Sequence, residues 1–227
     1  MSTPAPPSDW STWTPLAHAP RLSPATLAEL VDGGQAFRWQ RLVDDTWLGH
    51  WADHLVRLRL SPAGTLEWSA PAARAAHTGE ALSAYLFGHD TAAAIDALPW
   101  RSDPHLARCL TAFPGLTILR QPFGETLLGF LCSATKQIVQ IKQMIAHLAE
   151  RHGSPFPGTV PASTPEKAPA TPNPICHLIS DKPVLTFDFK VDTFLGNRLP
   201  TWSELAKVSE SDLRACLLGF RARYIHQ

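Results

Sequence analysis

The sequence predicts an α+β protein in which an antiparallel sheet is followed by helices. Between residues 36 and 68, short runs rich in aromatic and β-branched residues are separated by turn-forming residues, as in a sheet of short strands. From Thr78 onward, apolar residues recur every three or four positions, which is the spacing of amphipathic helices. Because the two periodicities occupy separate stretches, an α+β order is favoured over an alternating α/β order.

The first half of the chain is expected to contain one helix and a small meander. The helix is predicted at residues 22–30, where Ser23 and Pro24 suit the N-cap and the first helical position and Gly33 and Gly34 form a stop. A proline- and serine-rich lead-in precedes it at residues 1 to about 12. Strands are predicted at 36–39, 46–51 and 54–60, with 65–68 pairing back across a turn at 61–64.

Helices are predicted through most of the second half. Helix is expected from Thr78, with Leu82, Tyr85 and Leu86 on one face, and continues in short pieces at 92–98 and 104–112. A long helical stretch from Pro122 to about His152, broken near 133–135, and two short helices within 203–218 are expected to follow. The long stretch has an apolar stripe of Ile138, Ile141, Ile145 and Leu148, opposite a polar face of Lys136, Gln137, Gln140 and Gln143. The stripe predicts burial against the rest of the helical region.

One segment departs from this pattern. Seven of the residues between Ser154 and Pro174 are proline, which excludes regular structure there. The run 183–191 that follows alternates like an isolated strand with no evident partner. We therefore predict an inserted loop at about residues 159–199.

Composition narrows the class of protein. Twenty basic residues balance twenty acidic ones, so that any contact with nucleic acid must come from a local patch. No signal peptide is evident and the longest apolar run is too short to cross a bilayer, so we expect an intracellular protein with no membrane contact. The cysteines are expected to be free thiols and no metal site is predicted, since His147 and His152 do not share a helix face. The cysteines are Cys109, Cys132, Cys176 and Cys216.

Three motifs carry a more specific signal. They are GQAFRW at 34–39, RQP at 120–122 leading to CSATKQI at 132–138, and LGFRARY at 218–224. Together and in this order they resemble the motifs of the 8-oxoguanine DNA glycosylases, a family of the helix-hairpin-helix glycosylase superfamily. The resemblance covers most of the chain except the 159–199 insertion.

The resemblance implies both a fold and an activity. It implies an N-terminal α+β domain at 1–115 with a TATA-binding-protein-like antiparallel sheet, followed at 116–227 by an incomplete all-helical glycosylase domain. The family removes oxidised guanine from DNA during base-excision repair, and many members then nick the abasic site. The implied partner is double-stranded DNA containing an oxidised purine, bound by a monomer without a cofactor. The implied location is the nucleus in a eukaryote, or the cytoplasm and nucleoid in a bacterium.

The resemblance also implies roles for individual residues. A glycosylase must flip its target nucleotide out of the duplex and fill the gap that remains. Phe220 matches the aromatic wedge, and Arg221 matches an arginine that contacts the estranged cytosine. Thr135, followed by Lys136, falls where the family often has an asparagine that fills the hole, and Gln140 falls where many members have a second arginine. These departures weaken the expectation of strict selection for cytosine.

Two further residues complete the expected contacts. Gly34 matches a glycine whose carbonyl oxygen accepts a hydrogen bond from N7–H, a proton that only the oxidised base carries. Arg223 is expected to contact DNA. One hydrogen bond contributes only about 1 kcal/mol, so rejection of normal guanine must also involve repulsion.

No catalytic residue is assigned within the chain. The family's lysine lies on a glycine-rich hairpin after the GFRARY segment, and we expect it and its aspartate partner beyond Gln227. Lys190 and Asp192 are a poor substitute, because they precede that segment and lie two residues apart. Alternative hypotheses are a non-catalytic DNA-damage-binding module, an inactive truncated gene product, and a specificity for alkylated purines.

Each motif also has a purely structural interpretation. Gly33 and Gly34 are compatible with a simple helix C-cap, and Arg221 and Arg223 with solvated surface charges. The aromatic residues of the first half are expected in the core; they are Phe37, Trp39, Trp47 and Trp51. It is the joint occurrence of the motifs that favours a function on DNA.

Overall fold

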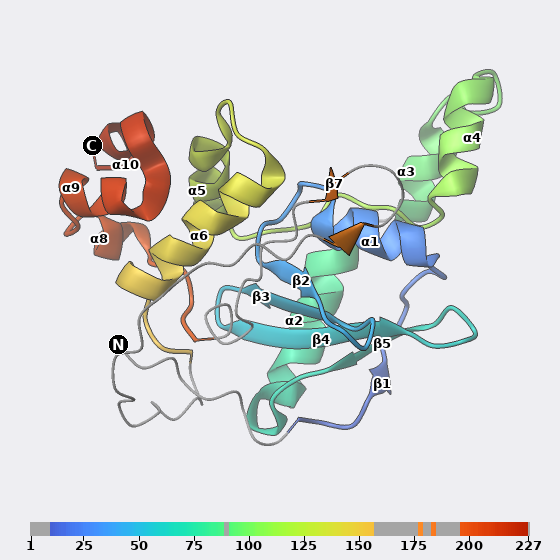
Figure 1. The fold of residues 1–227 in the computed structure, drawn as a ribbon. Coiled ribbons are helices and arrows are strands. Elements are labelled where there is room, and N and C mark those ends of the chain that lie inside the picture. The colour runs from blue at the N-terminus through green and yellow to red at the C-terminus, as the bar shows by residue number, and fades with distance from the viewer. Residues whose placement is uncertain (1–9, 89–90, 157–176, 179–182, 185–195, 227) are drawn as a thin grey trace.

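In the computed structural model, residues 10–88, 91–156, 177–178, 183–184 and 196–226 are described. A five-stranded antiparallel sheet has the strand order β1-β5-β4-β3-β2 (Figure 1). Its strands are β1 (Thr14–Pro15), β2 (Trp39–Arg41), β3 (Trp47–Trp51), β4 (His54–Leu60) and β5 (Leu66–Ser69). The predicted meander is confirmed, although β2 begins at Trp39 and residues 36–38 lead into it.

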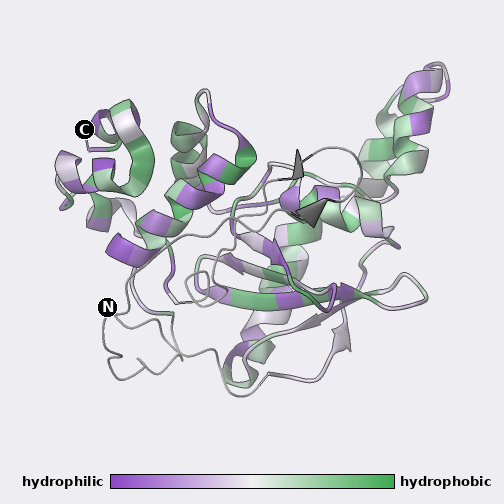
Figure 2. Ribbon diagram, in the orientation of Figure 1, coloured by the Kyte–Doolittle hydropathy of each residue, from purple (hydrophilic) through white to green (hydrophobic). Residues whose placement is uncertain are grey.

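Helices α1 (Pro24–Asp32) and α2 (Ala75–Phe87) cover one face of this sheet. Hydrophobic and hydrophilic residues alternate along β4 (Figure 2), and its Val56 and Leu58 join the core beneath the two helices. The Ser23 side chain accepts a hydrogen bond from Thr26 N as the predicted N-cap of α1. The opposite face carries a smaller cluster in which Phe156, from the segment after α6, packs against Leu48 and Leu55.

The remaining helices form a second region with its own core. They are α5 (Phe123–Ser133), α6 (Ile138–His152), α8 (Trp202–Leu205), α9 (Glu210–Leu213) and α10 (Ala222–His226). Helices α3 (Thr91–Ala97) and α4 (Pro104–Ala112) lie apart from this region, near α1 and at the opposite end of the molecule (Figure 1). The order predicted from the sequence, a sheet followed by helices, is therefore confirmed.

Three details differ from the predictions. Ile138 is 39% exposed because it is the first residue of α6, whereas Ile141, Ile145 and Leu148 are buried as expected. Strand β7 (Pro183–Val184) is not isolated, since it pairs with β6 (His177–Leu178); the rest of the 183–191 run lies outside the described residues. The last residues of the predicted 159–199 insertion are part of the packed structure, because Leu199 is buried in the second core. The insertion therefore ends before residue 196.

The cysteines and the helices each bear on the expectations of free thiols and of no membrane-spanning segment. Cys109, Cys132 and Cys216 are free thiols, and Cys176 lies outside the described residues. Across the described part of the chain, no helix combines the length and the apolar character needed to cross a membrane.

Candidate nucleic-acid interface

The turn between α5 and α6 exposes two of the predicted contact residues. Thr135 adopts a left-handed backbone conformation with φ of 58°, and its side chain and that of Lys136 are exposed. Gln137 and Gln140 form a capping box at the start of α6, in which Gln140 Oε1 accepts a hydrogen bond from Gln137 N at 3.2 Å. The side-chain oxygen of Gln140 is therefore occupied, while its amide NH₂ group remains a donor.

A second turn, at residues 217–221, presents the predicted wedge. The Phe220 side chain is 54% exposed, an unusual position for a phenylalanine. The preceding Gly219 has φ 57° and ψ −129°, a backbone conformation that residues with a Cβ atom disfavour. Leu217 is also left-handed, with φ of 65°, and is 55% exposed.

Arg221 joins these two turns. Its Nη2 donates hydrogen bonds to the Ala134 carbonyl and, at 3.1 Å, to Thr135 Oγ1. The guanidinium also lies 4.5 Å from the centre of the Phe220 ring. Because only 4% of Arg221 is exposed, its interpretation as a solvated surface charge is wrong. Arg223, by contrast, is exposed and lies over the Tyr224 ring at 5.0 Å.

Gly34 lies beside the start of α6. Its φ of 104° requires glycine, and a Cβ at this position would be 3.3 Å from Ile138 Cδ1. The next residue, Gln35, is held by the segment before α5: its Oε1 accepts from Leu119 N at 3.0 Å, and its carbonyl accepts from Gln121 Nε2. The predicted lesion-contacting loop is thus fixed close to the α5–α6 turn.

Lys142 on α6 holds both ends of that loop. Its Nζ forms an ion pair with Asp32, the last residue of α1, and donates a hydrogen bond at 3.0 Å to the carbonyl of Trp39, the first residue of β2. Residues 33–38 lie between these two attachment points. The role of Lys142 was not predictable from the sequence, because both of its partners are more than 100 positions away.

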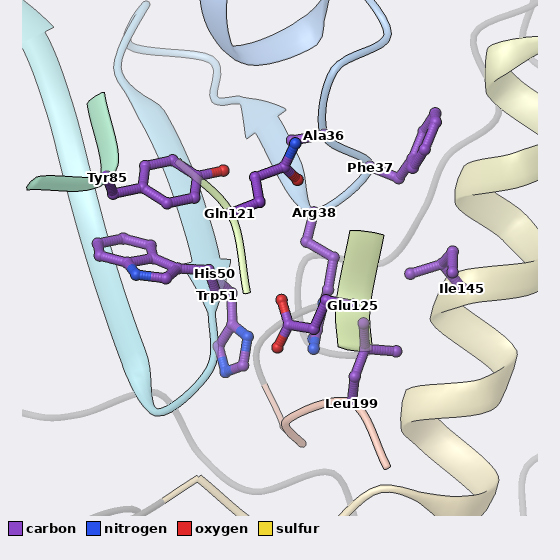
Figure 3. Close-up of a pocket in the computed structure, with 10 residues that line it drawn as sticks. All are labelled: Ala36, Phe37, Arg38, His50, Trp51, Tyr85, Gln121, Glu125, Ile145 and Leu199. Atoms are coloured by element: carbon purple, nitrogen blue, oxygen red, sulfur yellow. The ribbon is translucent and has the colours of Figure 1, made fainter. Parts of the chain in front are cut away.

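A small pocket with both apolar and polar lining lies between the sheet and the helical region (Figure 3). It is lined by the side chains of Arg38, His50 and Glu125, among others. Glu125 Oε1 accepts a hydrogen bond from Ala52 N at 2.8 Å, and Arg38 Nη2 donates to the Asn197 carbonyl at 2.7 Å. These contacts connect the residue before β2, the β3–β4 turn, α5 and the segment after the insertion.

Burial controls the ionisation of this cluster. It lowers the pKa of Arg38 to about 10 and raises the pKa of Glu125, an effect that the neighbouring Arg38 charge opposes. Burial also lowers the pKa of His50 far below its usual value, and neither of its ring nitrogens has a hydrogen-bond partner. Arg38 belongs to the first motif, and Glu125 lies between the two parts of the second. Arg38 is buried and Glu125 is partly buried, so these parts of the motifs contribute to the interior as well as to a surface.

Comparison with known proteins gives a consistent result. No protein-family profile matches the chain. The N-glycosylase/DNA lyase OGG1 of Arabidopsis thaliana is 24% identical over 202 residues, which are 88% of this chain and 46% of the relative. The chain thus spans about half the length of the curated relative that it matches.

Solved structures share the fold. MBOgg1, in complex with a low-affinity DNA ligand, matches with a TM-score of 0.66 and 24% identity, over 95% of this chain and 61% of that one. The Clostridium acetobutylicum 8-oxoguanine glycosylase/lyase, in complex with double-stranded DNA containing cytosine opposite 8-oxoguanine, matches with a TM-score of 0.62 and 22% identity, over 88% and 56%. Over most of its own length, the chain resembles the 8-oxoguanine DNA glycosylases in sequence and in fold.

Proposed function

We propose that this chain forms the lesion- and DNA-contacting part of an 8-oxoguanine-type DNA glycosylase that acts in base-excision repair. The observation that carries the proposal is the joining of two exposed turns by one buried arginine. Arg221 fixes the turn that bears Phe220 to the turn that bears Thr135 and Lys136. An aromatic side chain is thereby presented to solvent beside a cation and hydrogen-bonding groups, as a protein that separates stacked bases requires.

The proposed division of roles follows from exposure. Phe220 enters the base stack, and Lys136 and Arg223 contact the phosphate backbone. Thr135 and the amide NH₂ of Gln140 face the estranged base, while the Gly34 loop contacts the oxidised base. We propose that Arg221 acts mainly through Thr135 and Phe220, because its guanidinium is buried against them.

The chemical step is proposed for the whole protein rather than for residues of this chain. The motifs found here do not include the family's lysine hairpin, and Lys142 is held by Asp32 and Trp39. Base excision, and any cleavage of the abasic site, would need a nucleophile or an activated water that these residues do not supply.

We propose a monomer that meets DNA in the nucleus of a eukaryote or in the nucleoid of a bacterium, without a membrane.

Binding to matched duplexes tests this proposal. We expect the chain to bind a duplex with 8-oxoguanine opposite cytosine more tightly than the same duplex with guanine. Phe220→Ala should weaken binding to the lesion duplex about tenfold, because the unstacked step loses its apolar contact. The measurement is a fluorescence-anisotropy titration at one fixed salt concentration, since phosphate contacts are salt-dependent.

Phe123→Ala is the matched control. Phe123 is a phenylalanine that is 81% exposed, at the end of α5 remote from Thr135, and its loss should leave binding unchanged. Equal affinity of the parent chain for both duplexes would argue against the proposal. Lesion preference without base release by the whole natural protein would instead favour a damage-binding module.

A further inference from the structure

Leu217 occupies a backbone conformation that its own side chain disfavours. With φ 65° and ψ 14° it lies in the left-handed region, which glycine and asparagine adopt more readily than a branched residue. Its side chain is 55% exposed, so burial in the core does not compensate for this conformation. Strained backbone conformations cluster at functional sites, so Leu217 is a candidate for a function.

The position of Leu217 points to DNA. It lines a groove with Lys136 from the α5–α6 turn and with Gln140, Gln143 and Met144 of α6. It also precedes Phe220 by three residues on the same turn. Arg221 holds that turn against the α5–α6 turn. Leu217 and Phe220 are therefore two exposed apolar side chains on one rigid support, next to a cation.

We propose that Leu217 is a second wedge, which enters the duplex beside Phe220 and keeps the helix open on the side of the estranged base. This inference rests on the proposed function. An aliphatic wedge partly unstacks a base step and replaces the lost stacking with apolar contact. Because the left-handed turn already fixes the position of the Leu217 side chain in the free protein, DNA binding costs less conformational entropy.

The chemistry of leucine gives the wedge a specific consequence. Its side chain has no hydrogen-bonding atom, so it cannot distinguish cytosine from another opposite base. The part of the binding energy that Leu217 supplies is therefore independent of the opposite base, in contrast to any part supplied by the Gln140 amide. Removal of Leu217 should weaken binding by the same factor whichever base is opposite the lesion.

Leu217→Gly separates function from stability. Glycine relieves the backbone conformation, so the melting temperature should stay the same or rise. Affinity for the lesion duplex should nevertheless fall about tenfold, equally for cytosine and adenine opposite the lesion. The fluorescence of 2-aminopurine placed next to the lesion, which reports unstacking, should increase less on binding than with the parent chain.

Leu217→Asn provides a second variant, because asparagine tolerates the left-handed conformation but carries no apolar wedge. It should reproduce the loss of affinity and of fluorescence. Val43→Ala, at a fully exposed apolar residue between β2 and β3, is the control and should change neither.

The outcomes distinguish this inference from the proposed function. If the parent chain prefers lesion duplex and Phe220→Ala weakens binding, but both Leu217 variants bind and unstack like the parent, the second wedge is refuted and the proposed function stands. If the parent chain shows no lesion preference and no unstacking, both fail.

Discussion

At the scale of single residues, Gly34 allows a direct test of the proposed contact with the oxidised base. Gly34→Ala forces a side chain into a backbone of φ 104° and brings its Cβ to 3.3 Å from Ile138 Cδ1. We expect a loss of about 1 kcal/mol of stability and a smaller ratio of affinities for lesion and undamaged duplex, because the loop shifts away from the oxidised base. The ratio is measured by paired titrations.

Gly64→Ala supplies the comparison for that test. Gly64 also has a positive φ, 75°, but it lies in the turn between β4 and β5. The Gly64→Ala variant should lose a similar amount of stability but keep the parent chain's ratio of affinities for lesion and undamaged duplex. An equal fall in the ratio for both variants would show that Gly34 has no special contact with the lesion.

Individual site residues were predictable only where they belong to a motif. Gly34, Thr135 and Phe220 follow from short sequence patterns, and the structure confirms that Phe220 is exposed. The burial of Arg221 was not predictable, since its partner Ala134 lies 87 positions earlier and the two turns meet only in the folded chain. Nothing in the sequence marks Leu217 as left-handed.

At the scale of elements, the Lys142 contact tests whether α6 positions the loop at residues 33–38. Lys142→Met keeps most of the unbranched apolar side chain but removes the ammonium that holds Asp32 and the Trp39 carbonyl. We expect about 1 kcal/mol less stability, because the ion pair is partly exposed, and faster amide hydrogen exchange in the loop. Lesion preference should fall more than binding to undamaged DNA does.

Lys207→Met is the control for the loss of charge. Lys207 is exposed and follows α8, so its loss lowers the net charge equally. Exchange in the 33–38 loop should then match that of the parent chain. If both lysine variants change affinity alike and leave exchange in the loop unaltered, α6 does not position it through Lys142.

Element boundaries were more predictable than the contacts between elements. Ser23 and Pro24 mark the start of α1, and the apolar spacing of α6 marks its buried side. The pairing of β6 with β7 escaped prediction because each strand has only two residues. Such short strands carry no periodicity that a sequence pattern could reveal.

At the scale of the whole molecule, two hydrophobic cores meet at a boundary that also holds three ionisable side chains. One core lies under α1 and α2, and the other lies among α5, α6 and the C-terminal helices. The pocket between them is lined in part by Arg38, His50 and Glu125. Arg38 donates a hydrogen bond to the Asn197 carbonyl, and Glu125 accepts one from Ala52 N, so each forms a hydrogen bond with the backbone of the other region. Folding therefore withdraws charged groups from water where the two regions join, which makes stability sensitive to pH.

His50 makes that sensitivity measurable. Its pKa is lowered far below 6.5 by burial, so only the unfolded chain takes up a proton as the pH falls through 6.5. Stability should be unaffected by this residue above about pH 6.5 and should fall by up to about 1.4 kcal/mol per pH unit below it. Glu125 acts in the opposite direction, because its raised pKa lets the folded chain bind a proton first as the pH falls towards 4.5.

His50→Phe removes only the histidine contribution and can still contact Phe156, whose ring lies 5.1 Å from that of His50. Urea unfolding from pH 8 to 5 should therefore show the variant gaining on the parent chain below pH 6.5. Glu125 is present in both proteins, as is His54, whose pKa is also lowered by burial. Parallel curves would mean that His50 is protonated in the folded protein and that the boundary between the two cores admits charge more readily than its burial implies.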